Sequence, residues 1–327
     1  MMELSSVILI FTVSFVIPFG VFPKAINQLK KAGIVGKDVN KPDEPRIAEM
    51  GGLVTVAGFS AGVIVAVALR TFSHQLGGVN LIDIFAILST VLLIALIGII
   101  DDLMLLPQSV KAIIPIFASF PLVAIKAGHT VMNIPFVGTV DFGIVYSLIL
   151  VPLGITGAAN AVNMLAGFNG LELGMGAVAI GCLMVIAYLI KSTTSFIVLV
   201  AGLGALLATL RYNWYPAKVL IGDVGTLSIG SIIASAVILG NFELAGAVII
   251  IPYFFDFILK LFNGFPSKGW KGEYREGKLY CPSHGPVSLC QLIMKISGGI
   301  SERRLVLTLI TVELIFGLFA IFLYLKI

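Results

Sequence analysis

The sequence predicts an all-α integral membrane protein with about ten transmembrane helices and both termini on the outer side. Hydrophobic residues make up 58% of the chain and charged residues only 12%, whereas soluble domains carry about 25% charged residues. Apolar segments of about 20 residues, the length that crosses a bilayer, recur along the chain. Basic residues gather between alternate segments, which is typical of cytoplasmic loops. We therefore expect residues 1–327 to form a single polytopic membrane domain.

The first apolar segment, from about Leu4 to Val21, is expected to stay in the membrane as a true span. Glu3 stands before it where a signal peptide carries basic residues, and no small-residue cleavage site follows it. Nine further segments have comparable length and few charges. The ten predicted spans are residues 3–23, 51–70, 81–100, 109–127, 142–162, 171–190, 194–211, 222–241, 243–262 and 303–325.

The basic residues set the predicted orientation, because Lys and Arg are enriched in cytoplasmic loops. If the loop after the first span is inside, all but four of the 21 basic residues fall on the cytoplasmic side. The exceptions are Arg70, Lys126, Lys191 and Lys326. Both termini are then outside, and residues 24–50 and 263–302 form long cytoplasmic loops.

The net charge of +4 does not indicate a protein that binds nucleic acid. The charge comes from the predicted cytoplasmic loops, and the sequence has no basic face with interleaved aromatic residues. The three cysteines, Cys182, Cys281 and Cys290, are odd in number and show no CxxC spacing. The sequence therefore predicts neither a disulfide framework nor a zinc site.

Polar residues mark the cytoplasmic ends of four predicted spans. They are Asp101 and Asp102 after the third span, Lys111 at the start of the fourth, Asn160, Asn163 and Asn169 near the end of the fifth, and Asp223 at the start of the eighth. Each has an ordinary interpretation, such as a helix cap, a solvated stop or a snorkelling lysine. Their convergence on one face is better explained by an oxygen-rich site for Mg²⁺, which takes one or two protein groups plus substrate phosphates.

A secondary transporter or nucleotide-sugar carrier is the main alternative. Transporters place ionisable groups near the bilayer midplane and contain repeated halves, whereas here the groups lie at one face and no internal repeat is visible. Asp256 is the residue that fits a transporter best, and it could also line the lip of the same site or pair with Lys260 one turn on. A scaffold or receptor would not need so many polar groups converging on one side.

Five stretches of sequence carry a resemblance to a known family. They are GKDVNKPDEPRIAEMGG in the first loop, GIIDDLMLLPQSVKAIIPIFASFPL, NAVNMLAGFNGLELG, LIGDVGTLSIG, and CPSHGP in the last loop. In this order and spacing the chain resembles the polyprenyl-phosphate N-acetylhexosamine-1-phosphate transferases. It is most similar to their dolichyl-phosphate N-acetylglucosamine-1-phosphotransferase branch, found in archaea and eukaryotes, and the resemblance covers nearly the whole chain.

The resemblance implies an enzyme that moves N-acetylglucosamine-1-phosphate, or a related sugar-1-phosphate, from a UDP-sugar to a membrane polyprenyl or dolichyl phosphate and releases UMP. This would be the first step of lipid-linked glycan assembly, as in protein glycosylation. The implied partners are the UDP-sugar, the lipid phosphate and the bilayer, and a homodimer is compatible with the family. The implied location is the plasma membrane of a prokaryote, most readily an archaeon, or the endoplasmic reticulum, with the active site on the cytoplasmic face.

The resemblance also implies a role for each matching residue. Asn163 and Asp223 match the ligands of Mg²⁺, for which Mn²⁺ could substitute. Asp101 and Asp102 match the aspartate pair of the family, and Lys111 matches a lysine near the diphosphate. The matches to substrate-binding residues are Asn160, Leu165, Ala166, Gly167, Phe168, Asn169, Gly170 and Glu172 in the uridine segment, His284 in the last loop, and Lys41 and Glu49 near the mouth of the active site.

The reaction path and the donor sugar stay open at this point. One aspartate of the pair could act as a general base or as a covalent nucleophile, and we favour direct single displacement because a phosphate monoester is largely ionised at neutral pH. Ser283 and Gly285 flank His284, where the bacterial peptidoglycan branch has a run of histidines and the eukaryotic branch has basic residues on both sides. This difference argues against a muramoyl-pentapeptide donor and leaves sugar recognition by the last loop open.

Overall fold

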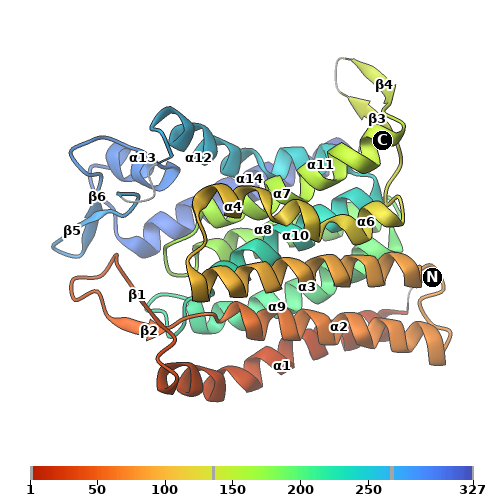
Figure 1. Cartoon of the computed structure of the whole chain (residues 1–327), viewed down its shortest axis with the longest axis horizontal. Helices are drawn as coiled ribbons and strands as arrows, with labels where there is room; N and C mark the ends of the chain where they lie inside the picture. Colours follow the sequence, from red (N-terminus) through yellow and green to blue (C-terminus); the bar gives the residue numbers. More distant parts are fainter. Residues whose placement is uncertain (1–2, 135–136, 266–268, 326–327) are drawn as a thin grey trace.

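The computed structural model describes residues 3–134, 137–265 and 269–325, and it forms a bundle of long helices (Figure 1). Eight described helices are apolar and long enough to cross a membrane. They are α1 (Leu4–Lys31), α2 (Gly52–Phe72), α3 (Leu81–Met104), α7 (Val151–Leu165) with the π-helical turn η1 (Tyr146–Leu150) before it, α8 (Leu171–Leu189), α9 (Thr193–Asn213), α10 (Gly222–Gly240) and α14 (Glu302–Leu325). The prediction of an all-α integral membrane protein is thereby confirmed.

A ninth span is bent in the middle. The predicted span over residues 243–262 consists of α11 (Glu243–Ile249) and α12 (Ile251–Phe262), whose axes differ by 55°. Pro252 lies in the first turn of α12. Because proline has no backbone N–H and its ring clashes with the preceding turn, the helix cannot continue straight through this position.

The predicted span over residues 109–127 is not a continuous helix. The structure has three short helices there, α4 (Gln108–Ile113), α5 (Pro115–Ala118) and α6 (Phe120–Ala124), which together make a shorter apolar stretch than a full span. Pro115 and Pro121 stand in the first turns of α5 and α6, so each break has the same cause as the bend at Pro252. The described residues therefore contain eight or nine full spans, fewer than the ten we expected.

Three short antiparallel hairpins and one short helix lie outside the bundle. They are β1 (Val35–Lys37) with β2 (Arg46–Ala48), β3 (Val131–Ile134) with β4 (Gly138–Asp141), β5 (Glu273–Arg275) with β6 (Lys278–Tyr280), and α13 (Leu289–Ile296). The two hairpins and α13 of the long loops lie at one end, and both chain termini lie at the opposite end with β3 and β4 (Figure 1). This agrees with the predicted alternation of spans, while the side that faces the cytoplasm stays a prediction.

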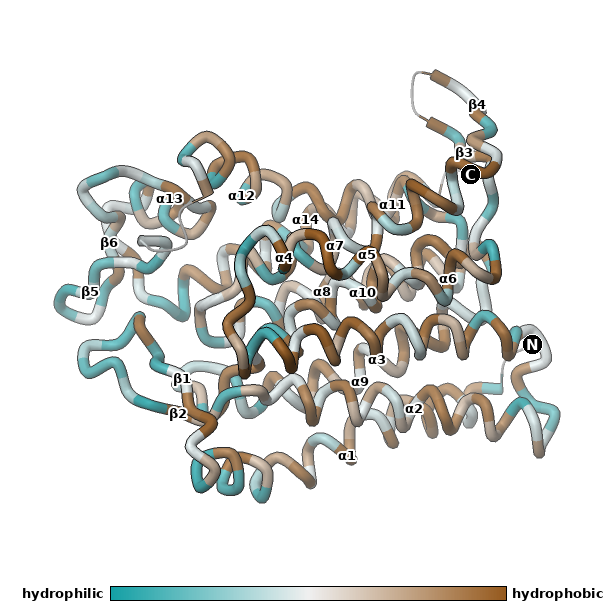
Figure 2. The backbone as a smooth tube through the Cα atoms, viewed as in Figure 1, coloured by the Kyte–Doolittle hydropathy of each residue, from teal (hydrophilic) through white to brown (hydrophobic). Residues whose placement is uncertain are grey.

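The helices are hydrophobic along their length and the polar residues concentrate at the ends of the bundle (Figure 2). Among the spans, α10 is the most deeply buried and α1 the least. The first turn of α10 is packed closely by two glycines of neighbouring helices. A Cβ atom at Gly98 of α3 would overlap the backbone of Val224, and one at Gly52 of α2 would overlap the backbone of Gly225. The start of α10 is thus held between α2 and α3 by backbone contact.

Candidate active site

The polar residues predicted to converge do lie together, at the end of the bundle that carries the long loops. Lys111 of α4 is central, because its Nζ lies 2.5 Å from Asp101 Oδ2 and 3.0 Å from Asp223 Oδ2. Asn163, in the last turn of α7, donates from Nδ2 to Asp223 Oδ1 at 3.1 Å. Four segments that are distant in the sequence, α3, α4, α7 and α10, therefore contribute to one polar cluster.

The two adjacent aspartates have different partners. Asp102 accepts hydrogen bonds from two amides at the start of α10, with Oδ1 2.7 Å from the Asp223 nitrogen and Oδ2 3.1 Å from the Val224 nitrogen. It satisfies helix N-terminal N–H groups as a capping residue does, although it comes from another helix. Asp101 instead accepts from the Leu106 amide at 2.9 Å with Oδ1, which leaves Oδ2 for Lys111. Asp101 thus orients Lys111, and Asp102 holds the helix that carries Asp223.

The segment before α10 is also tied to the first long loop. The Leu220 amide donates to the Ala48 carbonyl at 2.8 Å, and the Gly51 amide donates to the Leu220 carbonyl at 2.9 Å. These bonds bring Glu49 next to the cluster. Burial of the Glu49 carboxyl group raises its pKa above the usual value, and the negative charge of Asp223 makes a smaller contribution in the same direction. The site thus gathers four carboxyl groups around a single lysine, an excess that a bound cation would offset.

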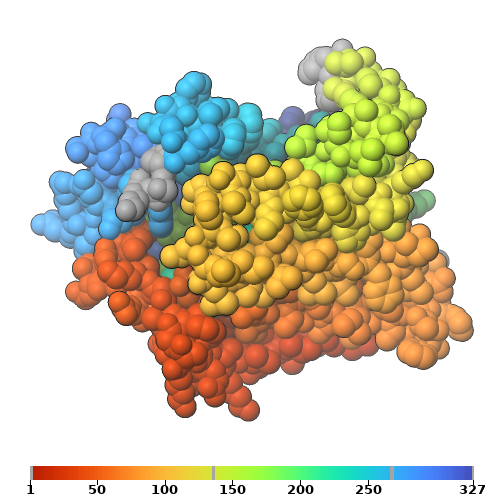
Figure 3. Space-filling model, in the orientation of Figure 1, coloured from red at the N-terminus to blue at the C-terminus, as the bar shows by residue number. Residues whose placement is uncertain are grey.

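A cavity of about 1300 Å³ adjoins this cluster. Its polar end includes Glu49, Lys111, Asn163 and Asp223, and its apolar part follows α7, α10, α11 and α12 as far as Ile238. Asp223 and Ile238 are separated by about 22 Å along the axis of α10, at 1.5 Å per residue. Figure 3 shows α4 in gold and α12 in blue on either side of a recess in which green atoms lie deeper. One continuous cavity therefore joins a charged mouth to a long apolar channel.

The predicted substrate-binding residues divide into two groups. Those that line the cavity are Glu49, Asn160, Ala166, Gly167 and Glu172. Those that are not among its described lining residues are Lys41, Leu165, Phe168, Asn169, Gly170 and His284. Leu165 and Phe168 are buried in the core, and His284 is exposed in the last loop beside Gly269. Part of the segment that the resemblance marks therefore faces the cavity, and part of it does not.

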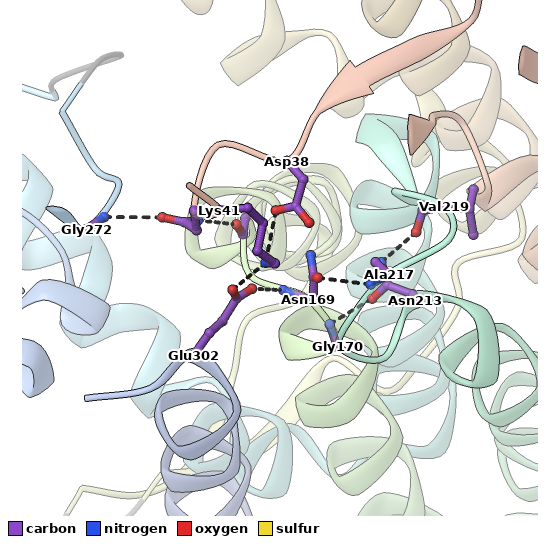
Figure 4. A network of polar contacts seen from close by, with 11 residues as sticks. Asp38, Lys41, Asn169, Gly170, Asn213, Ala217, Val219, Gly272 and Glu302 are labelled. Atoms are coloured by element: carbon purple, nitrogen blue, oxygen red, sulfur yellow. Dashed lines mark hydrogen bonds and ion pairs between the residues drawn. The ribbon is translucent and has the colours of Figure 1, made fainter. Parts of the chain in front are cut away.

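Lys41 and Asn169 belong to a buried polar network (Figure 4). Lys41 Nζ lies 3.1 Å from Asp38 Oδ1 and forms a second ion pair with Glu302 at the start of α14. Glu302 Oε1 accepts a hydrogen bond from the Asn169 amide at 2.8 Å, and Asn169 Oδ1 accepts one from the Ala217 amide at 3.0 Å. This network ties the first long loop, the loop between α7 and α8, and α14 together.

We expect Lys41→Met to destabilise the protein more than it weakens donor binding. The Lys41 side chain is only 10% exposed, and its loss would leave Asp38 and Glu302 as unpaired buried charges, at a cost of about 3–5 kcal/mol. Thermal unfolding in detergent and KM for the nucleotide donor should be measured together. A variant with unchanged thermal stability but a KM raised about tenfold would instead show that Lys41 contacts the substrate.

Lys260 is a cavity-lining residue that the sequence prediction did not place in the site. Its Nζ lies 2.7 Å from Asp256 Oδ2 and also donates to the Met164 carbonyl at the end of α7. Asp256 Oδ1 accepts from the Leu289 amide at 2.8 Å, which fixes α13 to α12. The predicted pairing of Asp256 with Lys260 is confirmed. The four-residue spacing of Asp256 and Lys260 on one helix face indicated that they pair, but nothing in the sequence showed that Lys260 reaches the end of α7.

The residues at the mouth fit a bound Mg²⁺ ion. Asp223 and Asn163 offer carboxylate and amide oxygens at the cavity wall, and these hard ligands suit Mg²⁺. No cluster of three or more His, Cys, Asp or Glu side chains in metal-binding range occurs among the described residues. A Mg²⁺ ion at this mouth would be held by one or two protein groups and completed by substrate phosphates.

Comparison with known proteins places the chain in a family. The model of glycosyl transferase family 4 matches residues 84–241. A relative from Saccharolobus solfataricus, provisionally named UDP-N-acetylglucosamine–dolichyl-phosphate N-acetylglucosaminephosphotransferase, is 37% identical over 98% of both chains. The Dictyostelium discoideum protein that bears this name is 28% identical over 88% of this chain and 80% of its own.

A more distant branch matches as well. The phospho-N-acetylmuramoyl-pentapeptide-transferase of Enterococcus faecalis is 30% identical over 72% of this chain and 75% of its own. The matched region of the family model contains the aspartate pair, Lys111, Asn163 and Asp223. With near full-length similarity to the relatives and the polar cluster assembled in the matched region, the chain belongs to glycosyl transferase family 4.

Proposed function

We propose that the protein transfers N-acetylglucosamine-1-phosphate from UDP-N-acetylglucosamine to dolichyl phosphate or a related polyprenyl phosphate and releases UMP. The observation that carries this proposal is the single cavity that joins the cluster of Lys111, Asn163 and Asp223 to an apolar channel along α10. A charged mouth suits a diphosphate, and an apolar channel suits a lipid tail. The names of the relatives from Saccharolobus solfataricus and Dictyostelium discoideum support the same pair of substrates.

In the proposed reaction an oxygen of the lipid phosphate attacks the β-phosphorus of the UDP-sugar. The bond from the β-phosphorus to the oxygen that bridges it to UMP breaks, and UMP leaves with the electron pair. Catalysis of phosphoryl transfer rests on positioning and charge neutralisation. Lys111 would neutralise charge on the diphosphate, and Asp101 would keep the Lys111 ammonium aimed at the mouth. Asn163 and Asp223 would hold Mg²⁺, or Mn²⁺ in its place, which when bound would stabilise negative charge on the leaving UMP.

The hydrogen bonds of the aspartate pair support direct displacement over a covalent intermediate. Both oxygens of Asp102 accept from the start of α10, and both oxygens of Asp101 are engaged by Leu106 and Lys111. A nucleophile would have to give up these partners before it attacked. Neither aspartate is among the described residues that line the cavity.

We expect Asp102→Ala to lower both stability and activity. The variant would leave two amides of α10 without their acceptor, at a cost of about 1–2 kcal/mol. Asp223 would also lose its fixed position, which we expect to slow transfer about 10²-fold, as small misplacements of a catalytic group do. Thermal unfolding and UMP release would be followed in parallel. Asp101→Asn is the comparison, because it should slow transfer while α10 keeps its cap, and full activity of Asp102→Ala would contradict the positioning role.

We further propose that the active site faces the cytoplasm of a prokaryotic plasma membrane or of the endoplasmic reticulum. The concentration of basic residues in the long loops beside the site supports this orientation. A homodimer stays a prediction.

The direct test is UMP release by the purified protein. UDP-N-acetylglucosamine would be supplied with and without dolichyl phosphate, and with Mg²⁺ or EDTA. Release that requires both the lipid and the metal is the expected result. If no UMP were released from any UDP-sugar, and the nucleotide sugar instead crossed proteoliposome membranes, the transporter interpretation would replace this one.

A further inference from the structure

Lys260 stands where the apolar channel of the cavity meets the polar mouth. Within α12 the lining residues are Phe254, Phe257 and Lys260. They are three positions apart, so they lie on one face of the helix. Ala247 and Ile250, at the end of α11, continue the apolar wall away from the mouth. A lipid tail that follows this wall from Ala247 toward the mouth therefore meets Lys260 as the first charged side chain.

The Lys260 ammonium is buried, but it has hydrogen-bonding capacity left. Its side chain is 11% exposed. One of its three N–H donors is given to the Met164 carbonyl. Asp256 Oδ2 lies 2.7 Å away, yet this ion pair is not aligned as a hydrogen bond, since Asp256 Oδ2 accepts none among the described residues. At least one N–H donor is therefore left for a ligand in the cavity.

The contact with α7 places the Lys260 ammonium beside the candidate metal ligands. Met164 follows Asn163 in the last turn of α7, and Asn163 donates to Asp223. Lys260, Asn163 and Asp223 line the same cavity. Lys111 belongs to α4, which lies across the recess from α12 (Figure 3). The mouth is thus flanked by one lysine from each side.

The charges at the mouth call for a second cation besides Lys111. The basic residues among the described lining are Lys37, Lys111 and Lys260. The Lys37 side chain is mostly exposed and faces Glu44 at 3.6 Å, and Lys111 is already held between two aspartates. A phosphate monoester carries a charge of about −1.5 to −2 at pH 7. With Lys111 beside the donor diphosphate, Lys260 is the cation that remains for the acceptor.

We infer that Lys260 binds the phosphate group of the lipid acceptor and holds it at the end of the apolar channel, beside the donor diphosphate. This inference rests on the proposed function. A lysine suits the position, because its ammonium forms charge-assisted hydrogen bonds to phosphate oxygens while its stem packs along apolar surface. The tail would then lie along Phe257 and Phe254, and the attacking oxygen would face the metal-binding residues.

The test separates the acceptor from the donor in the kinetics of UMP release. Lys260→Gln should raise KM for dolichyl phosphate about 10- to 100-fold, as the loss of a hydrogen bond between charged groups does. KM for UDP-N-acetylglucosamine should stay within about twofold of that of the natural protein, and so should Kd for UDP measured by calorimetry without lipid. Lys260→Arg should recover most of the affinity for the acceptor, because it keeps the positive charge.

A double variant distinguishes this role from a purely structural one. Lys260→Gln alone leaves Asp256 as a buried charge without its partner, which should lower thermal stability. Asp256→Asn in the same chain removes that charge, and its side-chain oxygen can still accept from the Leu289 amide. The double variant should therefore regain thermal stability, while KM for dolichyl phosphate stays as high as in Lys260→Gln. Recovery of that KM together with stability would show that Lys260 acts only on the fold.

Lys295→Gln provides the matched control. Lys295 lies in α13, is exposed, and is not among the described residues that line the cavity. Its replacement removes one positive charge from the same end of the molecule, and both KM values should stay within about twofold of the natural ones. A rise in KM for dolichyl phosphate equal to that of Lys260→Gln would assign the effect to general charge and overturn the inference.

Two outcomes for Lys260→Gln would also contradict the inference. A raised KM for UDP-N-acetylglucosamine with an unchanged KM for dolichyl phosphate would place Lys260 in the donor site. No change in either KM, with UMP still released, would refute the role of Lys260 and leave the proposed function intact. If the natural protein released no UMP with both substrates present, the proposed function would fail and the inference with it.

Discussion

Replacement of Asp223 by asparagine is expected to lower the rate of UMP release by about 10³-fold or more. Asp223 accepts from Asn163 and pairs with Lys111 at 3.1 and 3.0 Å, so its charge organises the mouth of the cavity. Asparagine has almost the same shape but no charge. It would therefore weaken the hold on Lys111 and on a divalent cation without opening a cavity in the protein.

The variant should remain folded, and this makes the result interpretable. The backbone amide of residue 223 would still donate to Asp102, so the start of α10 keeps its anchor. Asp83→Asn is the matched control, because Asp83 lies in the first turn of α3 at the opposite end of that helix from the aspartate pair. We expect the activity of Asp83→Asn to lie within about twofold of that of the natural protein. This is well below a tenfold change, which corresponds to about 1.4 kcal/mol. Asp223→Asn with more than a tenth of the natural activity would argue against a metal-holding role.

The sequence was sufficient to predict that these groups meet, because the alternation of spans places helix ends on definite sides. Asp101, Asn163 and Asp223 each stand at the end of an apolar run, and counting runs puts all of them on one face. Counting the spans could not predict which of these polar side chains bond to one another. The hydrogen bond that the Asp223 amide donates to Asp102 joins positions more than 100 residues apart, and it depends on how closely α3 approaches α10.

The packing of distant segments cannot be read from the sequence, and this also explains where the predicted spans and the predicted edge of the site differ from the structure. Hydropathy alone cannot distinguish a straight span from one that is broken by proline, so residues 109–127 and 243–262 were predicted as ordinary spans. Lys41 is a predicted substrate contact because the resemblance places it near the mouth of the active site. Its partner Glu302 is separated from it by 261 positions, and only the folded arrangement shows that the loop is fixed to α14.

Gly98→Ala is expected to reduce both stability and activity, although Gly98 is not among the described residues that line the cavity. The new Cβ would overlap the Cα of Val224 and approach the carbonyl carbon of Asp223. These are backbone atoms, so no side-chain rotation can relieve the contact and α3 has to move away from α10. Overpacking of this kind costs about 1–3 kcal/mol. The movement would also lengthen the hydrogen bonds that the first amides of α10 donate to Asp102, and we expect about a 10²-fold loss of UMP release.

The control for this variant is Gly181→Ala in α8. A Cβ at Gly181 would meet no described atom of a neighbouring element within 4 Å, and alanine is the better helix former by about 0.5–1 kcal/mol. Gly181→Ala should therefore be as stable as the natural protein or slightly more so, with unchanged turnover. Thermal unfolding in detergent and UMP release would be recorded for both variants. If Gly98→Ala matched Gly181→Ala in both measurements, the backbone contact between α3 and α10 would not be what positions Asp223. The fixed position of Asp223 relative to the aspartate pair would then need another explanation, such as the hydrogen bonds that join Leu220 to the first long loop.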